Sequence, residues 1–165
     1  STGEVLGIAD SFGLAFFKSQ EAAGQTLPTQ GTVLISVTAH DKEDIVSTAT
    51  YLREAGFNIV ATEGTHRFLT ERGVEATAIK KVHEGRPNIV DAIHNKEINL
   101  IINTPIGKSG KYDDSYIRKT AIRYKVPYIT TTAAAKAAAE GIRAYLESGD
   151  GVGVKSLQQY HSEIE

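Results

Sequence analysis

Short runs of branched apolar residues alternate with helical patterns along most of this chain, and this alternation limits the folds available to it. The run at residues 32–37, Thr-Val-Leu-Ile-Ser-Val, has the composition of a strand buried on both faces. The apolar residues that follow it recur at the spacing of one helix face; they are Ile45, Val46, Ala49 and Leu52. Strands that alternate with helices in this way form a parallel sheet covered on both faces. The pattern predicts an α/β fold, a three-layer Rossmann-like domain.

The alternation continues almost to the end of the chain. Five strands are expected, at residues 32–37, 57–61, 75–82, 98–103 and 126–130. Helix starts are expected at Asp41, Asn88, the run Asp113–Ser115 and Thr132, and helix ends at Gly24, Gly56, Gly73, Asn95 and Leu146. The alanine-rich segment from Thr132 to Leu146 is expected to be the last helix.

The first thirty residues differ in composition from the rest. Phe12, Phe16 and Phe17 fall on one short expected helix, and residues 27–31, Leu-Pro-Thr-Gln-Gly, have the composition of a linker. Three rings on one helix need a partner surface, which the following domain would supply if the helix docks on it. The sequence contains no methionine, which favours a processed chain or a piece of a longer one, and no cysteine, which excludes disulfides and thiol catalysis.

The overall charge is small. A formal net charge of −2 and a pI near 6.2 give no general attraction to nucleic acid or to an anionic membrane. The sequence has no apolar run of about 18 residues and no signal peptide at its start. We expect neither nucleic-acid nor membrane partners, and a cytoplasmic location.

Two familiar nucleotide-binding motifs are missing. The segment Gly107-Lys108-Ser109 lacks the glycine that a P-loop places five residues before its Gly-Lys pair, because that position is Ile102. No Gly-x-Gly-x-x-Gly follows the first expected strand. We interpret residues 107–109 as part of a mobile basic loop.

Polar and cationic residues gather where the expected strands end, which is where ligands bind in open parallel sheets. The turn Thr62–Thr65 joins a strand to a helix, and its hydroxyls, its Gly64 and the free N–H groups of the helix suit a phosphate or carboxylate. Lys42, Lys81, Asn103 and Thr104 follow other strands and are expected at the same edge. Together these residues predict a site for an anionic ligand with a polar ring, such as a nucleoside monophosphate.

A general acid or base is harder to find near this cluster. Glu63 and Glu84 are the only nearby carboxylates that the sequence suggests. The cluster therefore favours a binding or sensing role over catalysis.

Four segments of the chain carry a resemblance to a known family: residues 3–16, 80–87, 101–104 and 117–126. The last three resemble the C-terminal regulatory domain of the large subunit of carbamoyl phosphate synthetase, a methylglyoxal-synthase-like domain. Residues 3–16 resemble the end of the second ATP-grasp unit of that subunit. The resemblance implies a five-stranded parallel sheet, with residues 1–30 as the tail of the synthetase unit and residues 31–165 as the effector-binding domain.

The resemblance also implies a function. The domain would bind UMP as inhibitor and IMP as activator without catalysis of its own. The whole enzyme, a ligase, would use ATP with Mg or Mn to make carbamoyl phosphate from glutamine and bicarbonate for pyrimidine and arginine biosynthesis. Its partners would be the small glutaminase subunit, the synthetase domains and further copies of itself. The implied effector contacts are Ser36, Lys42, Thr62, Gly64, Thr65, Lys81, Asn103 and Thr104, with Thr130 on the side where relatives bind ornithine.

The chain departs from the family pattern at three positions. Pro105 replaces a hydroxyl-bearing residue, Glu63 stands where a histidine can occur, and Ile129 replaces an aspartate before Thr130. A lysine at position 81 and the lack of tryptophan favour a nucleotide over N-acetylglutamate. The loop at residues 84–87 lacks the catalytic aspartate of methylglyoxal synthase, which argues against lyase activity. A lyase of that type remains the alternative enzyme, and an oligomerisation module the alternative structural role.

Overall fold

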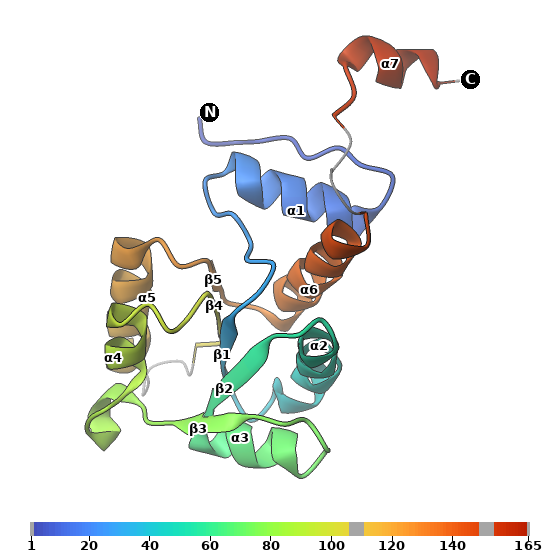
Figure 1. Cartoon of the computed structure of the whole chain (residues 1–165). Coiled ribbons are helices and arrows are strands. Elements are labelled where there is room, and N and C mark those ends of the chain that lie inside the picture. Colours follow the sequence, from blue (N-terminus) through green and yellow to red (C-terminus); the bar gives the residue numbers. More distant parts are fainter. Residues whose placement is uncertain (1, 106–110, 149–153, 165) are drawn as a thin grey trace.

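A parallel sheet forms the centre of the molecule. The computed structural model describes residues 2–105, 111–148 and 154–164. Its five strands run in the order β3-β2-β1-β4-β5, all parallel (Figure 1). The strands are β1 (Thr32–Ser36), β2 (Asn58–Thr62), β3 (Thr77–Ile79), β4 (Leu100–Asn103) and β5 (Tyr128–Ile129). The order reverses between β1 and β4, which makes this position the switch point of the sheet.

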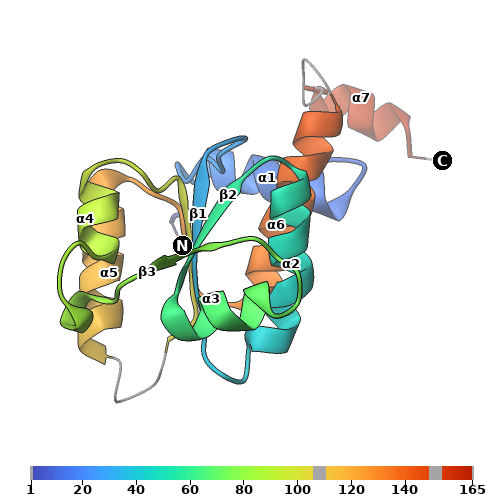
Figure 2. The ribbon, with the colours of Figure 1, turned by 60° about the horizontal axis from the view of Figure 1, so that its bottom comes forward.

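Helices cover both faces of the sheet, so the expected three-layer α/β fold is confirmed. The helical elements are α1 (Phe12–Ala22), α2 (Lys42–Glu54), α3 (Glu63–Thr70), the short 3-10 turn η1 (Val82–Glu84), α4 (Ile89–His94), α5 (Lys111–Tyr124), α6 (Thr132–Glu147) and α7 (Leu157–Ser162). Figure 2 shows α4 and α5 on one face and α2, α3 and α6 on the other. Among the described residues, no helix is long and apolar enough to cross a membrane.

The two faces of β1 explain this arrangement. Leu34 packs with Ile101 and with apolar residues of α4 and α5. Its neighbours Val33 and Ile35 pack on the opposite side, with residues of α2, α3 and α6. All three β1 side chains are fully buried, as a strand inside a parallel sheet requires.

Several expected boundaries are wrong. The third strand was expected over residues 75–82 but covers only Thr77–Ile79, because it lies at the sheet edge and pairs with β2 alone. The run Asp113–Ser115 lies inside α5 instead of before it, since the helix already includes Lys111. Helix α7 follows α6, so the alanine-rich helix is not the last one.

Asp41 precedes α2 as expected but does not cap it. Its backbone is already helical, and its side chain makes no capping hydrogen bond. Its carboxylate instead accepts a hydrogen bond of 2.6 Å from the hydroxyl of Thr38. The expected helix stops at Gly56 and Gly73 are confirmed, each with a positive φ.

Helix α1 docks on the domain that follows it. Phe17 is 2% exposed and stacks on Tyr145 of α6, with ring centroids 4.5 Å apart. Phe16 packs against the same core, whereas Phe12 is 71% exposed. The partner surface of this helix is therefore α6, and the division of the chain at residue 30 stays a prediction.

Candidate functional site

A row of buried polar side chains crosses the carboxyl edge of the sheet. Ser36, the last residue of β1, pairs in register with Asn103, the last residue of β4. Thr62 ends β2, and its hydroxyl lies 3.2 Å from that of Ser36. The three residues are only 2–6% exposed. They therefore form a polar row at the switch point, where ligands of parallel sheets bind.

The polar row lies on the α4/α5 side of the sheet. Side chains alternate along a strand, so Ser36 shares a face with Leu34, and Asn103 with Ile101. Ile79 of β3 packs against the same core, which puts the half-buried Lys81 on this side as well. The structure thus places Lys81 at the expected edge, one strand beyond Thr62.

A second group of predicted residues surrounds the start of α3. A methyl group built on Gly64 would lie 3.5 Å from Nζ of Lys42, and the same ammonium lies 5.6 Å from the ring centroid of Phe68. The oxygen of the Thr65 hydroxyl accepts a hydrogen bond of 3.3 Å from the backbone N–H of Val37. The Lys42 ammonium therefore lies beside the first turn of α3, where the helix dipole is also positive.

Thr104 holds the loop between β1 and α2. Its hydroxyl oxygen accepts a hydrogen bond of 2.9 Å from the backbone N–H of Thr38. The pKa of Asp41 lies below its ordinary value, mainly because the Thr38 hydroxyl donates a hydrogen bond to the carboxylate and, to a smaller extent, because the Thr104 hydroxyl does. Thr104 thus joins β4 to this loop, and its hydroxyl is already engaged.

Thr130, half-buried, follows β5 directly, beside the end of β4.

Two residues beside Asn103 were missed by the sequence prediction. The side-chain amide of Asn103 donates hydrogen bonds to Oδ1 of Asp114, at 3.0 Å, and to the hydroxyl oxygen of Tyr128, at 2.7 Å. Burial raises the pKa of Tyr128, so its hydroxyl stays protonated at neutral pH. In the sequence, the only sign that Asp114 and Tyr128 lie near Asn103 was the spacing of the expected helix and strand that contain them.

The expectation that no carboxylate other than Glu63 and Glu84 approaches the cluster is wrong. Asp114 contacts Asn103, and Asp41 contacts the Thr38 hydroxyl. Glu84 is engaged in its own turn, because its carboxylate accepts a hydrogen bond of 2.7 Å from the backbone N–H of Lys81. The sequence placed Asp41 and Asp114 only as helix caps, since their contacts depend on how the helices pack.

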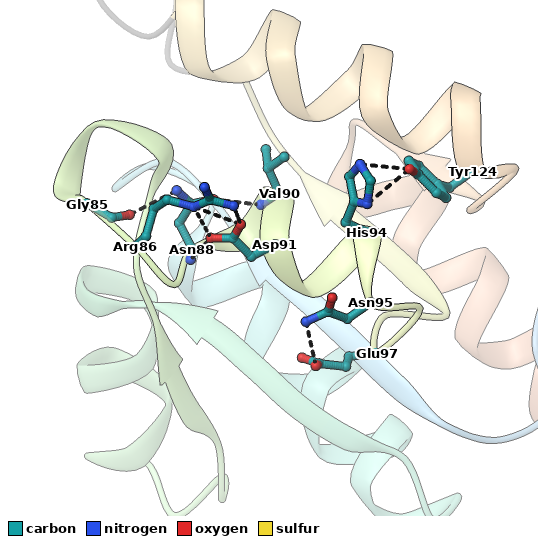
Figure 3. A network of polar contacts seen from close by, with 9 residues as sticks. All are labelled: Gly85, Arg86, Asn88, Val90, Asp91, His94, Asn95, Glu97 and Tyr124. Carbon is teal, nitrogen blue, oxygen red and sulfur yellow. Dashed lines mark hydrogen bonds and ion pairs between the residues drawn. The ribbon is translucent and has the colours of Figure 1, made fainter.

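The segment after Lys81 is fastened by a polar network, shown in Figure 3. The amide of Asn88 donates to the carbonyl of Gly85 at 2.8 Å and accepts from the N–H of Val90 at 2.9 Å. Arg86 pairs with Asp91, and that carboxylate also accepts from the N–H of Asn88. The network fixes the connection between Lys81 and α4.

His83 adds a link across the site, because its ring contacts the carboxylate of Asp113 at the start of α5. The basic loop expected around residues 107–109 lies outside the described residues. Pro105, the last described residue before that gap, is exposed.

The fold and the site define a class of domain that comparison with known proteins identifies. The family model described as the MGS-like domain matches residues 44–130. This covers more than half of the chain, so the chain belongs to the MGS-like domain family. A crystal structure of methylglyoxal synthase from Elizabethkingia anophelis has the same fold, with a TM-score of 0.53 and 17% identity over 82% of this chain and 92% of that one.

Curated relatives name a particular enzyme. The chain is 51% identical over 98% of its length to the carbamoyl phosphate synthase large chain, C-terminal section, of Methanopyrus kandleri, and spans 30% of that protein. It is 48% identical over 98% of its length to the same section from Aquifex aeolicus, and spans 31% of it. The expected resemblance to this large chain is thereby confirmed.

Proposed function

We propose that this chain is the regulatory domain of a carbamoyl phosphate synthase large chain and binds a nucleoside monophosphate at the carboxyl edge of its sheet. The observation that carries the proposal is the position of the Lys42 ammonium beside the first turn of α3. Two positive groups side by side repel each other, and a bound phosphate would relieve that repulsion. The buried polar row next to this turn supplies partners for a sugar or base.

The parts of the ligand would be divided between the two groups of residues. The phosphate would bind Lys42, the N–H groups around Gly64 and Thr65, and Lys81. The nucleoside would lie along the polar row of Thr62, Ser36 and Asn103, where hydroxyl and amide groups can exchange hydrogen bonds with it. Thr104 would act indirectly, through the β1–α2 loop that it holds.

The effectors and the activity of the whole enzyme belong to the same proposal, and the names of the curated relatives support the enzyme. We propose UMP as inhibitor and IMP as activator of an enzyme that makes carbamoyl phosphate with ATP and Mg or Mn. The remaining domains of the large chain and a glutaminase subunit would be the partners. The chain spans about a third of the C-terminal sections that it matches, which leaves room for those domains.

Isothermal titration calorimetry of the 165-residue chain with UMP, IMP and inorganic phosphate tests the proposal. We expect saturable binding of at least one nucleotide, tighter than that of phosphate. Absence of heat and of a thermal shift with either nucleotide at millimolar concentration would refute it.

A lyase of the methylglyoxal synthase type is the second candidate, because Asp114 brings a carboxylate to the polar row. Turnover of dihydroxyacetone phosphate by the chain would support it, and loss of that turnover in Asp114→Asn would assign the base. Effector binding by a strictly monomeric chain would separate the regulatory role from a purely structural role in subunit contacts.

A further inference from the structure

We infer that Tyr128 and Asp114 are positioning residues that fix the side-chain amide of Asn103 and thereby select ligands that carry a nucleoside. The inference rests on the proposed nucleotide site and adds the source of its specificity. Neither residue belongs to the set of predicted ligand contacts.

The contacts of Asn103 decide which way its amide points. A carboxylate only accepts hydrogen bonds, so the group that faces Oδ1 of Asp114 at 3.0 Å must be the NH₂ of the amide. The second N–H of that group donates a hydrogen bond of 2.7 Å to the hydroxyl oxygen of Tyr128. With both donors occupied, the amide can offer a ligand only its carbonyl oxygen.

The topology indicates where this oxygen lies. Strand β4 has β5, with Tyr128, on one side and β1, with Ser36, on the other. An amide whose NH₂ group faces Tyr128 carries its oxygen on the opposite side, because the two atoms diverge from one carbon. The Asn103 oxygen therefore points away from both Tyr128 and Asp114, and β1 is the neighbour of β4 on the side away from Tyr128.

An acceptor at this place discriminates between parts of a nucleotide. The phosphate monoester of a nucleotide, as a dianion, offers only acceptors and gains nothing from a carbonyl oxygen, whereas a sugar hydroxyl or a base N–H can donate to it. Inorganic phosphate would bind at the Lys42 group and so would not reach Asn103. Asn103 should therefore contribute to the binding of a nucleoside monophosphate and not to the binding of inorganic phosphate. A freely rotating amide would lose this distinction.

The test compares Tyr128→Phe with the control Tyr124→Phe. Tyr128→Phe keeps the ring and removes the hydroxyl that orients Asn103. Tyr124→Phe removes a hydroxyl that contacts His94 at 2.7 Å, in a contact between α4 and α5 (Figure 3). For Tyr128→Phe we expect the dissociation constant for UMP or IMP to be three- to tenfold larger. This is the usual effect of losing about one neutral hydrogen bond. The affinity of Tyr128→Phe for inorganic phosphate, and both affinities of Tyr124→Phe, should stay within about twofold.

A conservative variant separates orientation from folding. Asp114→Asn can still offer a carbonyl oxygen to the Asn103 amide, so it should retain more nucleotide affinity than Asp114→Ala. Equal losses for nucleotide and phosphate in Tyr128→Phe, or no loss for either, would overturn the inference.

NMR reports on the positioning without any ligand, so its failure is distinct from failure of the proposed function. The side-chain NH₂ signals of Asn103, assigned by their loss in Asn103→Asp, should show slow hydrogen exchange in the wild type and faster exchange in Tyr128→Phe. If these signals exchange equally fast in both proteins, Tyr128 does not hold the amide.

Discussion

The backbone of Gly13 in α1 lies directly against that of Gly141 in α6. A methyl group on Gly141 would come within 2.5 Å of the carbonyl oxygen of Gly13, and one on Gly13 within 2.9 Å of the backbone of Glu140. The missing side chains let the two helices approach closely enough for Phe17 to stack on Tyr145. This contact ties the N-terminal segment to α6.

Gly141→Ala is expected to destabilise the protein. The added methyl group overlaps backbone, which cannot rotate away, so we expect a loss of about 1–3 kcal/mol in the free energy of unfolding. Gly64→Ala is the matched control, because its methyl group would have only an ordinary contact, 3.5 Å from the end of the Lys42 side chain. Urea unfolding of both variants checks the prediction, which fails if Gly141→Ala is as stable as Gly64→Ala.

The phenylalanines of α1 should differ sharply in their effect on stability. Phe17→Ala removes a buried ring and leaves a cavity, at a cost of about 3–5 kcal/mol in the free energy of unfolding. Phe12, on the same helix, is 71% exposed, and Phe12→Ala should change stability by about 0.5 kcal/mol or less. Thermal unfolding measures both effects, and similar losses for the two variants would contradict the docking of α1 through Phe17.

Lys81→Ala should weaken nucleotide binding by about tenfold or more, since a hydrogen bond to a charged group contributes roughly 1.5–3 kcal/mol. The neighbouring Lys80 is exposed and points to the other face of the chain, so Lys80→Ala is the control. Calorimetry with UMP and IMP compares the two. An unchanged dissociation constant in Lys81→Ala would remove this lysine from the site.

Asp41 should make part of the stability depend on pH. Its pKa in the folded protein lies below the unfolded value of about 3.9, because the hydroxyls of Thr38 and Thr104 stabilise the carboxylate. Its contribution is therefore present above about pH 4 and is lost as the pH falls through the folded pKa. The difference in unfolding free energy between wild type and Asp41→Asn should be larger at about pH 6 than at about pH 2.5.

Urea unfolding at the two pH values measures that difference, and Asp44→Asn, at an exposed position in the first turn of α2, is the control. A difference that does not shrink at low pH would show that the Thr38–Asp41 contact does not stabilise the charged carboxylate.

The sheet was predictable because its signals are local. The apolar run around Leu34 and the helix stops at Gly56 and Gly73 each reflect a few neighbouring residues, and all are confirmed. The short third strand was not predictable in the same way, because its length depends on its lying at the edge, with a partner on one side only. Helix α7 was missed although Ser156 and Gln159 have the capping-box spacing of a helix start and make both of its hydrogen bonds.

The sequence by itself determined that Ser36, Thr62 and Asn103 lie at or next to the carboxyl ends of strands and so near one edge of a parallel sheet, and their position at that edge is confirmed. Their role in binding stays a prediction. Only the tertiary structure decided which polar groups they meet. Asp114 and Tyr128 reach Asn103 from 11 and 25 residues further along the chain. Periodicity describes each segment separately, whereas these contacts exist because α5 and β5 pack beside β4 and bring distant side chains to one amide.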